Sequence, residues 1–233
     1  MKLSVLLVAT LVALASMASA APLCTAVGST MADYVALGST GCQIGDKVFY
    51  NFFYSSSGGG LGVAVPASAV TLSPVGADTY NPGIAFSSDN WFVPGGSTTR
   101  TSVIDSSISF TVTVLPGGHP IDDASLTLGS FDQVGAGTAS IGETVLAADG
   151  FTQLGFMGVG TNGQLAAEVN FAPTSTIQIS KNFALFVPQN GTGSIRVSSF
   201  TENFSEIPEP VGAILIGSGL LALGAWRRHG NRG

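Results

Sequence analysis

Few side chains in the central part of this sequence are suited to catalysis. Between residues 21 and 205 the only histidine is His119, which stands in a Pro-Gly-Gly-His-Pro segment typical of a turn. A hydroxyl or thiol nucleophile needs a base beside it, and a zinc site needs several ligands, so one histidine supports neither kind of centre. The sequence therefore predicts no catalytic residues, no metal site and no cofactor.

The acidic residues do not define a reaction centre either. Asp122 and Asp123 follow the turn, but calcium takes about six to eight oxygen ligands, and adjacent residues of a strand point to opposite faces. A glycosidase needs two acids that face each other across a cleft. The scattered acids of this chain neither establish nor exclude such a pair, so a secreted hydrolase stays open as a hypothesis.

Aromatic residues indicate a different chemistry, the recognition of sugars. Trp91 and Phe92 are near Tyr80 and Phe86 in the sequence, and an exposed Trp or Tyr ring offers a flat apolar face with a polar edge. We therefore name Trp91 and His119 as a candidate ligand surface. The competing interpretation places these rings in the hydrophobic core.

Strands with an alternating pattern must position these residues. Residues 104–114 place Ile104, Ile108 and Phe110 on one face and polar side chains on the other, which is typical of a half-buried strand. Further strands are predicted over residues 48–54, 123–128, 164–171, 177–187 and 195–204. Turns rich in Gly and Pro separate them, so we expect an all-β domain, an antiparallel β-sandwich of jelly-roll or Ig-like type with about seven to ten strands. A β-barrel is the alternative fold. Residues 55–60, rich in Ser and Gly, are expected to form a flexible loop.

Composition and charge limit the classes of partner. Only 9% of the 233 residues are charged, and 45% are hydrophobic. Residues 21–205 hold four Lys or Arg against twelve Asp or Glu, a net charge of 4 − 12 = −8. Nucleic-acid binding needs a basic patch, so we expect no nucleic-acid partner. A segment of this size suits one domain, which we place at residues 21–205.

The N-terminus has the three parts of a secretory signal peptide. A basic start is followed by an uncharged apolar stretch over residues 3–15 and then by a small-residue site that ends in Ala18-Ser19-Ala20. We expect signal peptidase to recognise Ala18 and Ala20 and to cleave after Ala20, so that residues 1–20 form the signal helix. A retained membrane helix is the alternative.

The only two cysteines, Cys24 and Cys42, come soon after this cleavage site. Export places them in an oxidising compartment, where a disulfide between them is the default. Metal binding is the alternative, but two thiols and His119 supply too few ligands. A disulfide that closes a loop of this size would stabilise the fold by about 3 kcal/mol in the chain-entropy model.

The C-terminus carries a second targeting segment. Residues 206–210 form a linker with a Pro-Glu-Pro motif, residues 211–226 are uncharged and apolar, and residues 227–233 are basic. The apolar run would span about 24 Å as a helix, against roughly 30 Å of hydrocarbon, so we expect a short transmembrane-type helix with cytoplasmic arginines. A last core helix is the alternative, although such a helix would be amphipathic. The residues that define the tail are Pro208, Glu209, Pro210, Trp226, Arg227 and Arg228.

This tail resembles a PEP-CTERM sorting signal. In that family the exported protein is held in the inner membrane by the tail and is then cleaved near the Pro-Glu-Pro motif by an exosortase. The resemblance implies a Gram-negative bacterium that makes exopolysaccharide, and a final place at the cell surface or outside the cell. Related tails also occur on some secreted ice-binding proteins. The body is similar in outline to small PEP-CTERM proteins through residues 41–47 and 123–126, without an implied activity.

These observations support three functional hypotheses. The first is a non-enzymatic surface or extracellular-matrix protein, delivered through its tail to the envelope or to exopolysaccharide. The second is a β-sandwich module that binds carbohydrate or ice through exposed aromatic or threonine side chains. The third is the secreted hydrolase.

Overall fold

The computed structural model describes residues 21–95 and 99–205. The predicted signal peptide, with Ala18 and Ala20, and the predicted sorting tail lie outside this range. The tail residues concerned are Pro208, Glu209, Pro210, Trp226, Arg227 and Arg228. Within the described part of the chain, no helix has the length and apolar character needed to cross a membrane.

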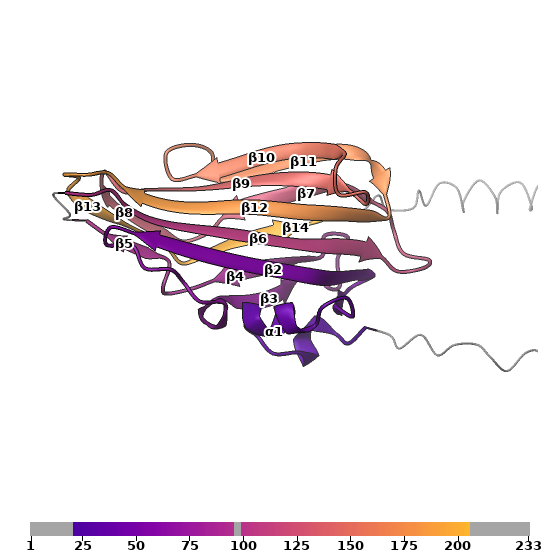
Figure 1. Cartoon of the computed structure of the whole chain (residues 1–233). Helices are drawn as coiled ribbons and strands as arrows, with labels where there is room; N and C mark the ends of the chain where they lie inside the picture. Colours follow the sequence, from indigo (N-terminus) through magenta and orange to yellow (C-terminus); the bar gives the residue numbers. More distant parts are fainter. Residues whose placement is uncertain (1–20, 96–98, 206–233) are drawn as a thin grey trace, which may run out of the picture.

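Antiparallel sheets make up most of the described chain. The first sheet has the order β1 (Cys42–Ile44), β2 (Lys47–Gly59), β6 (Ser102–Val114), β12 (Thr176–Val187), β9 (Thr138–Ala147) and β10 (Gln153–Gly160). The second has the order β11 (Ala166–Thr174), β7 (Ile121–Leu128), β14 (Ser199–Asn203), β4 (Gly83–Ser87) and β3 (Thr71–Val75). The third, at the left end of Figure 1, joins β5 (Phe92–Pro94), β13 (Gly193–Val197) and β8 (Phe131–Gly135).

The two larger sheets pack face to face around one hydrophobic core (Figure 1). The ring of Phe110 on β6 lies 6.3 Å from that of Phe86 on β4, and Phe49 on β2 lies 5.8 Å from Phe204, which follows β14. Side chains along β6 alternate between buried and partly exposed, beginning with Ser102, because successive strand residues point to opposite faces. The prediction of an antiparallel β-sandwich is confirmed at this level.

Two expectations about the strands are wrong. The described residues form fourteen strands, whereas about seven to ten were expected. The prediction was too low because seven of the strands have only three to five residues, which is too short to show a period of two. Residues 55–59, expected in a loop, continue β2 and pair with β6 as far as Gly59 opposite Val103. Backbone hydrogen bonds hold this segment, so it needs no apolar side chains. A Cβ at Gly58 would lie 2.5 Å from the Gly62 carbonyl oxygen, which explains the glycine.

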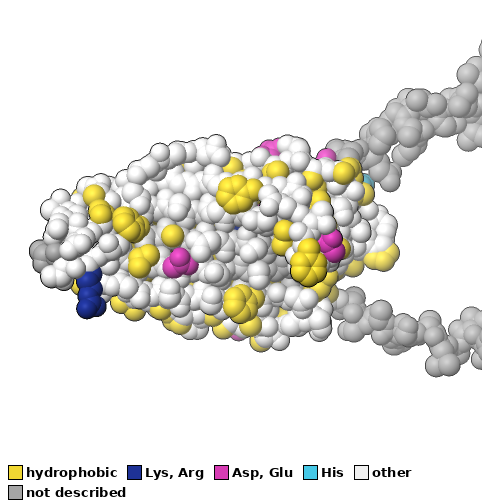
Figure 2. Space-filling view, turned by 45° about the horizontal axis from the view of Figure 1, so that its top comes forward, with side chains coloured by type: hydrophobic (Ala, Val, Ile, Leu, Met, Phe, Trp, Pro, Cys, Tyr) yellow, Lys and Arg dark blue, Asp and Glu magenta, His cyan; other side chains and the backbone are white. Residues whose placement is uncertain are grey.

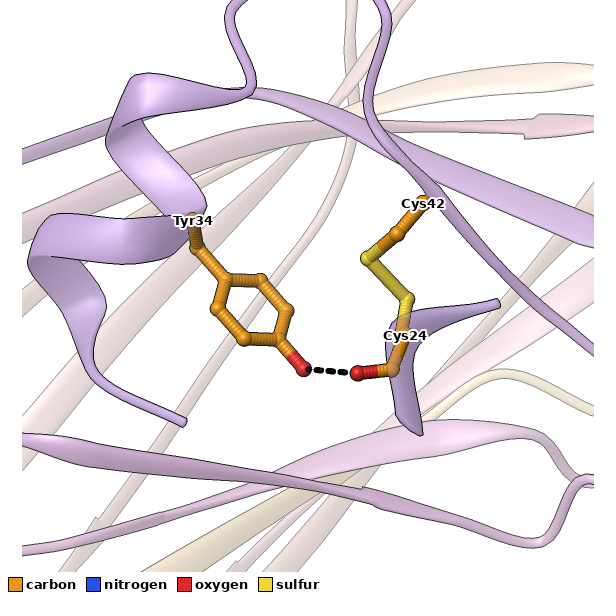
Figure 3. Close-up of a disulfide and its surroundings, with 3 residues drawn as sticks. All are labelled: Cys24, Tyr34 and Cys42. Atoms are coloured by element: carbon orange, nitrogen blue, oxygen red, sulfur yellow. Dashed lines mark hydrogen bonds between the residues drawn. A yellow bond between two sulfur atoms is a disulfide. The ribbon is translucent and has the colours of Figure 1, made fainter. Parts of the chain in front are cut away.

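The N-terminal segment is fixed to the edge of the sandwich by a disulfide between Cys24 and Cys42 (Figure 3). This confirms the predicted pairing, and it joins a 3-10 turn, η1 (Cys24–Ala26), to β1. Tyr34, on the short helix α1 (Met31–Ala36), donates a hydrogen bond of 3.4 Å from its hydroxyl to the Cys24 carbonyl oxygen. Burial raises the pKa of Tyr34 to about 12.

The helix α1 was not predicted, because its six residues are too few to show a sustained helical period; its local signal is a capping box. The Asp33 backbone N–H donates to the Thr30 hydroxyl oxygen, and the Asp33 carboxylate accepts from the Thr30 backbone N–H. These hydrogen bonds with Thr30 lower the pKa of Asp33. The cap marks the start of the helix, and a hydrogen bond from the Met31 backbone N–H to the Val70 carbonyl oxygen ties this first turn to the rest of the domain.

Candidate functional site

Trp91 is not on a surface, so the predicted pairing of Trp91 and His119 in one ligand surface is wrong. The indole of Trp91 is fully buried and lies 4.8 Å from the ring of Phe183 and 5.4 Å from that of Phe200. Phe86 is also fully buried. A large ring between two sheets removes more apolar area from water than one on a loop, so the competing core interpretation holds for both residues.

His119 instead contributes to an open depression where three loops meet. Its ring lies 5.8 Å from that of Tyr80, which is 56% exposed, and its backbone N–H donates to the Asp46 carboxylate at 2.6 Å. Asp46 also pairs with Lys47 at 2.9 Å. The depression has a volume of about 360 Å³, and it is lined by Gly45, Asp46, Ala77, Asp78, Thr79, Tyr80 and His119. These contacts tie Asp46 and Lys47 to the loop that carries His119, so we regard the depression as a structural junction.

Asp122 and Asp123 do not form a cation site either. Asp123 accepts a hydrogen bond of 3.2 Å from the Ser205 backbone N–H, which ties β7 to the residues after β14. Burial raises the pKa of Asp123, although the bond to Ser205 acts in the opposite direction. Among the residues that the structure describes, no group of three His, Cys, Asp or Glu side chains could hold a metal ion.

The solvent face of the six-stranded sheet carries an unusual set of side chains. Pairing of the strands places its outward residues in rows that cross five strands, from β2 through β6, β12 and β9 to β10. We call three of these rows the hydroxyl face. The first row is Phe53, Ser109, Ser180, Thr144 and Phe156; the second is Ser55, Ser107, Asn182, Gly142 and Gly158; the third is Ser57, Asp105, Ala184, Ser140 and Gly160.

Two aromatic rings stand at the ends of the first row. Phe53 on β2 is 56% exposed, and Phe156 on β10 is 64% exposed, although large apolar side chains usually gain free energy from burial. Four strand spacings of about 4.8 Å separate the two strands, a span of roughly 19 Å. A Cβ at Gly142 would lie 3.8 Å from the Phe156 ring, so the sheet surface next to this ring is the bare backbone of Gly142.

The groups between the two rings are small and almost uncharged. Asp105 is the single charged residue of the three rows, and its carboxylate accepts a hydrogen bond of 3.0 Å from the Asn182 amide. The hydroxyl groups of Ser109, Ser180 and Thr144 make no hydrogen bond to another described residue. Figure 2 shows a face that is mostly white, the colour of the backbone and of side chains that are neither hydrophobic nor charged, with few charged side chains. The hydroxyl face can therefore donate and accept hydrogen bonds to a ligand.

Sequence reasoning missed the hydroxyl face for an identifiable reason. Phe53 was one of several aromatic residues in a strand with aromatic side chains on both faces, and residues 138–147 and 153–160 were not among the predicted strands. The pairing of Phe156 with Thr144, and of Thr144 with Ser180, depends on contacts between distant segments. The local signal that could have indicated this face was the set of polar residues that alternate with apolar ones over residues 104–114.

Comparisons with known proteins add only distant structural likeness. No protein-family model matches the chain, and no similar curated protein is found. TmCBM61 in complex with β-1,4-galactotriose has 15% identity and a TM-score of 0.29, over 66% of this chain and 88% of that chain. TmCBM27, described as recognising mannan, has 10% identity and a TM-score of 0.30, over 68% and 90%.

A third similar structure is the enzymatically active domain of tailspike protein 4 from bacteriophage CBA120. It has 14% identity and a TM-score of 0.27, over 65% of this chain and 19% of that chain. At such identities and scores these likenesses carry no argument about what this chain binds. The case for a function rests on the chain's own residues.

Proposed function

We propose that this chain is an exported, non-catalytic surface protein whose β-sandwich binds a neutral polysaccharide on the hydroxyl face. The observation that carries the proposal is the first row, which crosses five strands and places three hydroxyl side chains between two exposed rings, Phe53 and Phe156. The proposal combines the carbohydrate-binding hypothesis for the domain with the surface-protein hypothesis for its delivery.

The chemistry of the first row matches that of a sugar chain. Each sugar ring has C–H groups, which pack on aromatic rings, and hydroxyl groups around its rim, which exchange hydrogen bonds with side chains. Serine and threonine hydroxyls both donate and accept, so they can satisfy a sugar hydroxyl in either role. A neutral sugar fits better than an acidic one, because residues 21–205 carry a net charge of 4 − 12 = −8.

The distance between the two rings favours a polymer over a single sugar. A ligand has to extend over roughly 19 Å to contact both Phe53 and Phe156, since four strand spacings lie between them. Small molecules usually bind in concave pockets that enclose most of their surface. The hydroxyl face is not such a pocket: the side chains of its first row lie along a line across five strands, which suits an extended polymer.

Ice matches the hydroxyl face less well than a sugar chain. Binding to a crystal lattice needs side chains of one kind at a regular spacing. The three rows mix Ser, Asn, Ala and Gly, and they contain one threonine, Thr144. The projecting rings of Phe53 and Phe156 also interrupt a flat surface.

Delivery to the cell surface is supported by the sequence at both ends. The predicted signal peptide directs export, and the tail with Pro208, Glu209 and Pro210 resembles a PEP-CTERM signal, so transient membrane holding and cleavage by an exosortase belong to the proposal. Both ends of the described chain lie at the right end of Figure 1. A protein held at the membrane by this end of the sandwich keeps its hydroxyl face accessible to exopolysaccharide.

The sugar proposal is tested by affinity electrophoresis of the full chain, purified with its disulfide intact, in gels that contain neutral or acidic polysaccharides. We expect retardation by a neutral polymer and its loss in the F53A/F156A double variant. Phe151→Ala is the matched control, because Phe151 is 90% exposed in the turn after β9, outside the hydroxyl face. Absence of retardation by every neutral polymer, or an equal loss in the control, would contradict the proposal.

Two further measurements separate the alternatives. Inhibition of ice recrystallisation without polysaccharide binding would favour ice as the ligand. For delivery, one epitope tag after residue 21 and another after Gly233 should separate into a processed body and a released tail. A single full-length cytoplasmic species that keeps both tags would rule out the proposed sorting.

A further inference from the structure

Three charged side chains meet inside the core of the sandwich. Lys181 on β12 lies directly opposite Glu143 on the neighbouring strand β9, and Glu202 on β14 reaches them from the facing sheet. The Lys181 ammonium donates to Oε2 of Glu143 and, at 2.5 Å, to Oε2 of Glu202. All three side chains are completely inaccessible to solvent.

The charges and hydrogen bonds of this group do not balance. One ammonium faces two carboxyl groups, and the remaining oxygens, Oε1 of Glu143 and Oε1 of Glu202, have no hydrogen-bond partner among the described residues. The nearest aromatic contact of the ammonium is the Phe110 ring, 5.4 Å away. Burial of charges and of unpaired polar atoms is unfavourable, so an ordinary ion pair is a costly way to fill this part of the core.

We propose that Lys181 and Glu202 condense to a side-chain amide that links the two large sheets covalently. The geometry places the amine nitrogen within hydrogen-bond distance of the Glu202 carboxyl group, so the reacting groups are already held together in a dry environment. Glu143 lies beside the same nitrogen and serves as the base. The proposal does not depend on the sugar-binding function.

The protonation states suit this reaction. Burial first, and then the neighbouring Glu143, raise the pKa of Glu202 well above its ordinary value, while Lys181 acts in the opposite direction. This shift favours the neutral acid form of Glu202. A neutral carboxylic acid is a better acyl donor than a carboxylate, and Glu143, in contact with the Lys181 nitrogen, is placed to take a proton from it.

The step balances without any further reactant. Glu143 takes one proton from the ammonium, the free amine attacks the carboxyl carbon of Glu202, and a C–N bond forms. The C–O bond to the Glu202 hydroxyl then breaks, and the hydroxyl leaves as water with a second proton from the nitrogen. The third proton stays on the amide nitrogen, and Glu143 ends as a neutral acid. No oxidant or reductant takes part, and the buried charges disappear.

The test is mass spectrometry of the purified full chain, reduced and denatured, followed by peptide mapping. We expect a mass lower by one water than that of the sequence between the observed termini, and a branched peptide that joins the segments around Lys181 and Glu202. A mass without this loss, with all three side chains unmodified, would overturn the proposal. A branch from Lys181 to Glu143 would overturn the assignment of Glu202.

Variants separate the roles of the residues. Glu143→Gln keeps the shape of the side chain but removes the base, so complete loss of the branched peptide is expected. Lys47→Arg alters another buried lysine, which contacts Asp46, and should leave the loss of water intact. Should the Glu143 variant not fold, the mass of the unaltered chain still decides between an amide and an ion pair.

Discussion

The two faces of the six-stranded sheet use the same strands for different purposes. On β12, Lys181 and Phe183 point into the sandwich and are almost fully buried, whereas Ser180 and Asn182 point to solvent. An inward side chain fills space or compensates a charge, so its removal leaves a cavity or an unpaired group. An outward serine does neither. Stability and the proposed recognition can therefore be separated residue by residue along one strand.

The largest expected effect comes from the inner face. Lys181→Met removes the nitrogen between Glu143 and Glu202, and with it both the buried ion pairs and the proposed amide, so it should lower the free energy of unfolding by about 3–5 kcal/mol. Ser180→Ala, one residue earlier on the outer face, should change it by less than about 0.5 kcal/mol. Urea denaturation of the full chain measures both. Similar losses for the two variants would break the comparison between the faces.

The disulfide between Cys24 and Cys42 belongs to neither face, and it is expected to contribute almost as much to the free energy of unfolding. Replacing Cys24 and Cys42 by alanine should lower the free energy of unfolding by about 3 kcal/mol, because the unfolded chain loses a closed loop. Thermal unfolding with and without reductant measures this effect, and reductant should then have no effect on the variant. Polysaccharide binding by the folded fraction should be unchanged. A loss of binding would mean that the hydroxyl face depends on the N-terminal segment.

The outer face is expected to show its importance in binding alone. Phe53→Ala and Phe156→Ala should each weaken polysaccharide binding about fivefold, and both together roughly thirtyfold, since an aromatic contact contributes about 1 kcal/mol. Isothermal titration or gel retardation measures the change, while urea midpoints should stay close to that of the unaltered chain. If the midpoints fell as far as for Lys181→Met, these rings would belong to the core.

The smallest expected effect lies in α1, outside both faces. Thr30→Ala removes the capping hydroxyl and should cost about 1 kcal/mol, measured by urea denaturation at neutral pH. In the unaltered chain, the bonds from Thr30 lower the pKa of Asp33. Their contribution is present above the ordinary Asp value of about 3.9 and is lost as the pH falls through the folded pKa. NMR titration should show the pKa of Asp33 rising in the variant; an unchanged value would contradict the capping role.

The sequence predicted the parts of the fold that depend on local patterns. The alternation in residues 104–114 and the two cysteines led to the sandwich and to the disulfide, and both are present. Strands of three to five residues, such as β5 and β8, were missed because they are too short for a pattern. The segment after Ser55 was missed because backbone pairing, which composition does not reveal, makes it a strand.

The candidate site was less accessible to prediction. Trp91 has the chemistry of a sugar platform, but its position between Phe183 and Phe200 depends on how two sheets pack. Phe156 and Ser180 become neighbours of one row only through the register of β9, β10 and β12. Glu143, Lys181 and Glu202 are isolated charges in the sequence, and only packing brings them together.

The position of β14 has a mechanical consequence. This last strand of the described chain lies in the middle of its sheet, hydrogen-bonded to β7 on one side and to β4 on the other, and the chain continues from it toward residues 206–233. A force applied there pulls β14 along its own axis, so the hydrogen bonds on both sides carry the load together and cannot open one after another. If residues 206–233 hold the protein at the membrane as proposed, the load enters at a strand with hydrogen-bonded partners on both sides, where an edge strand would have one.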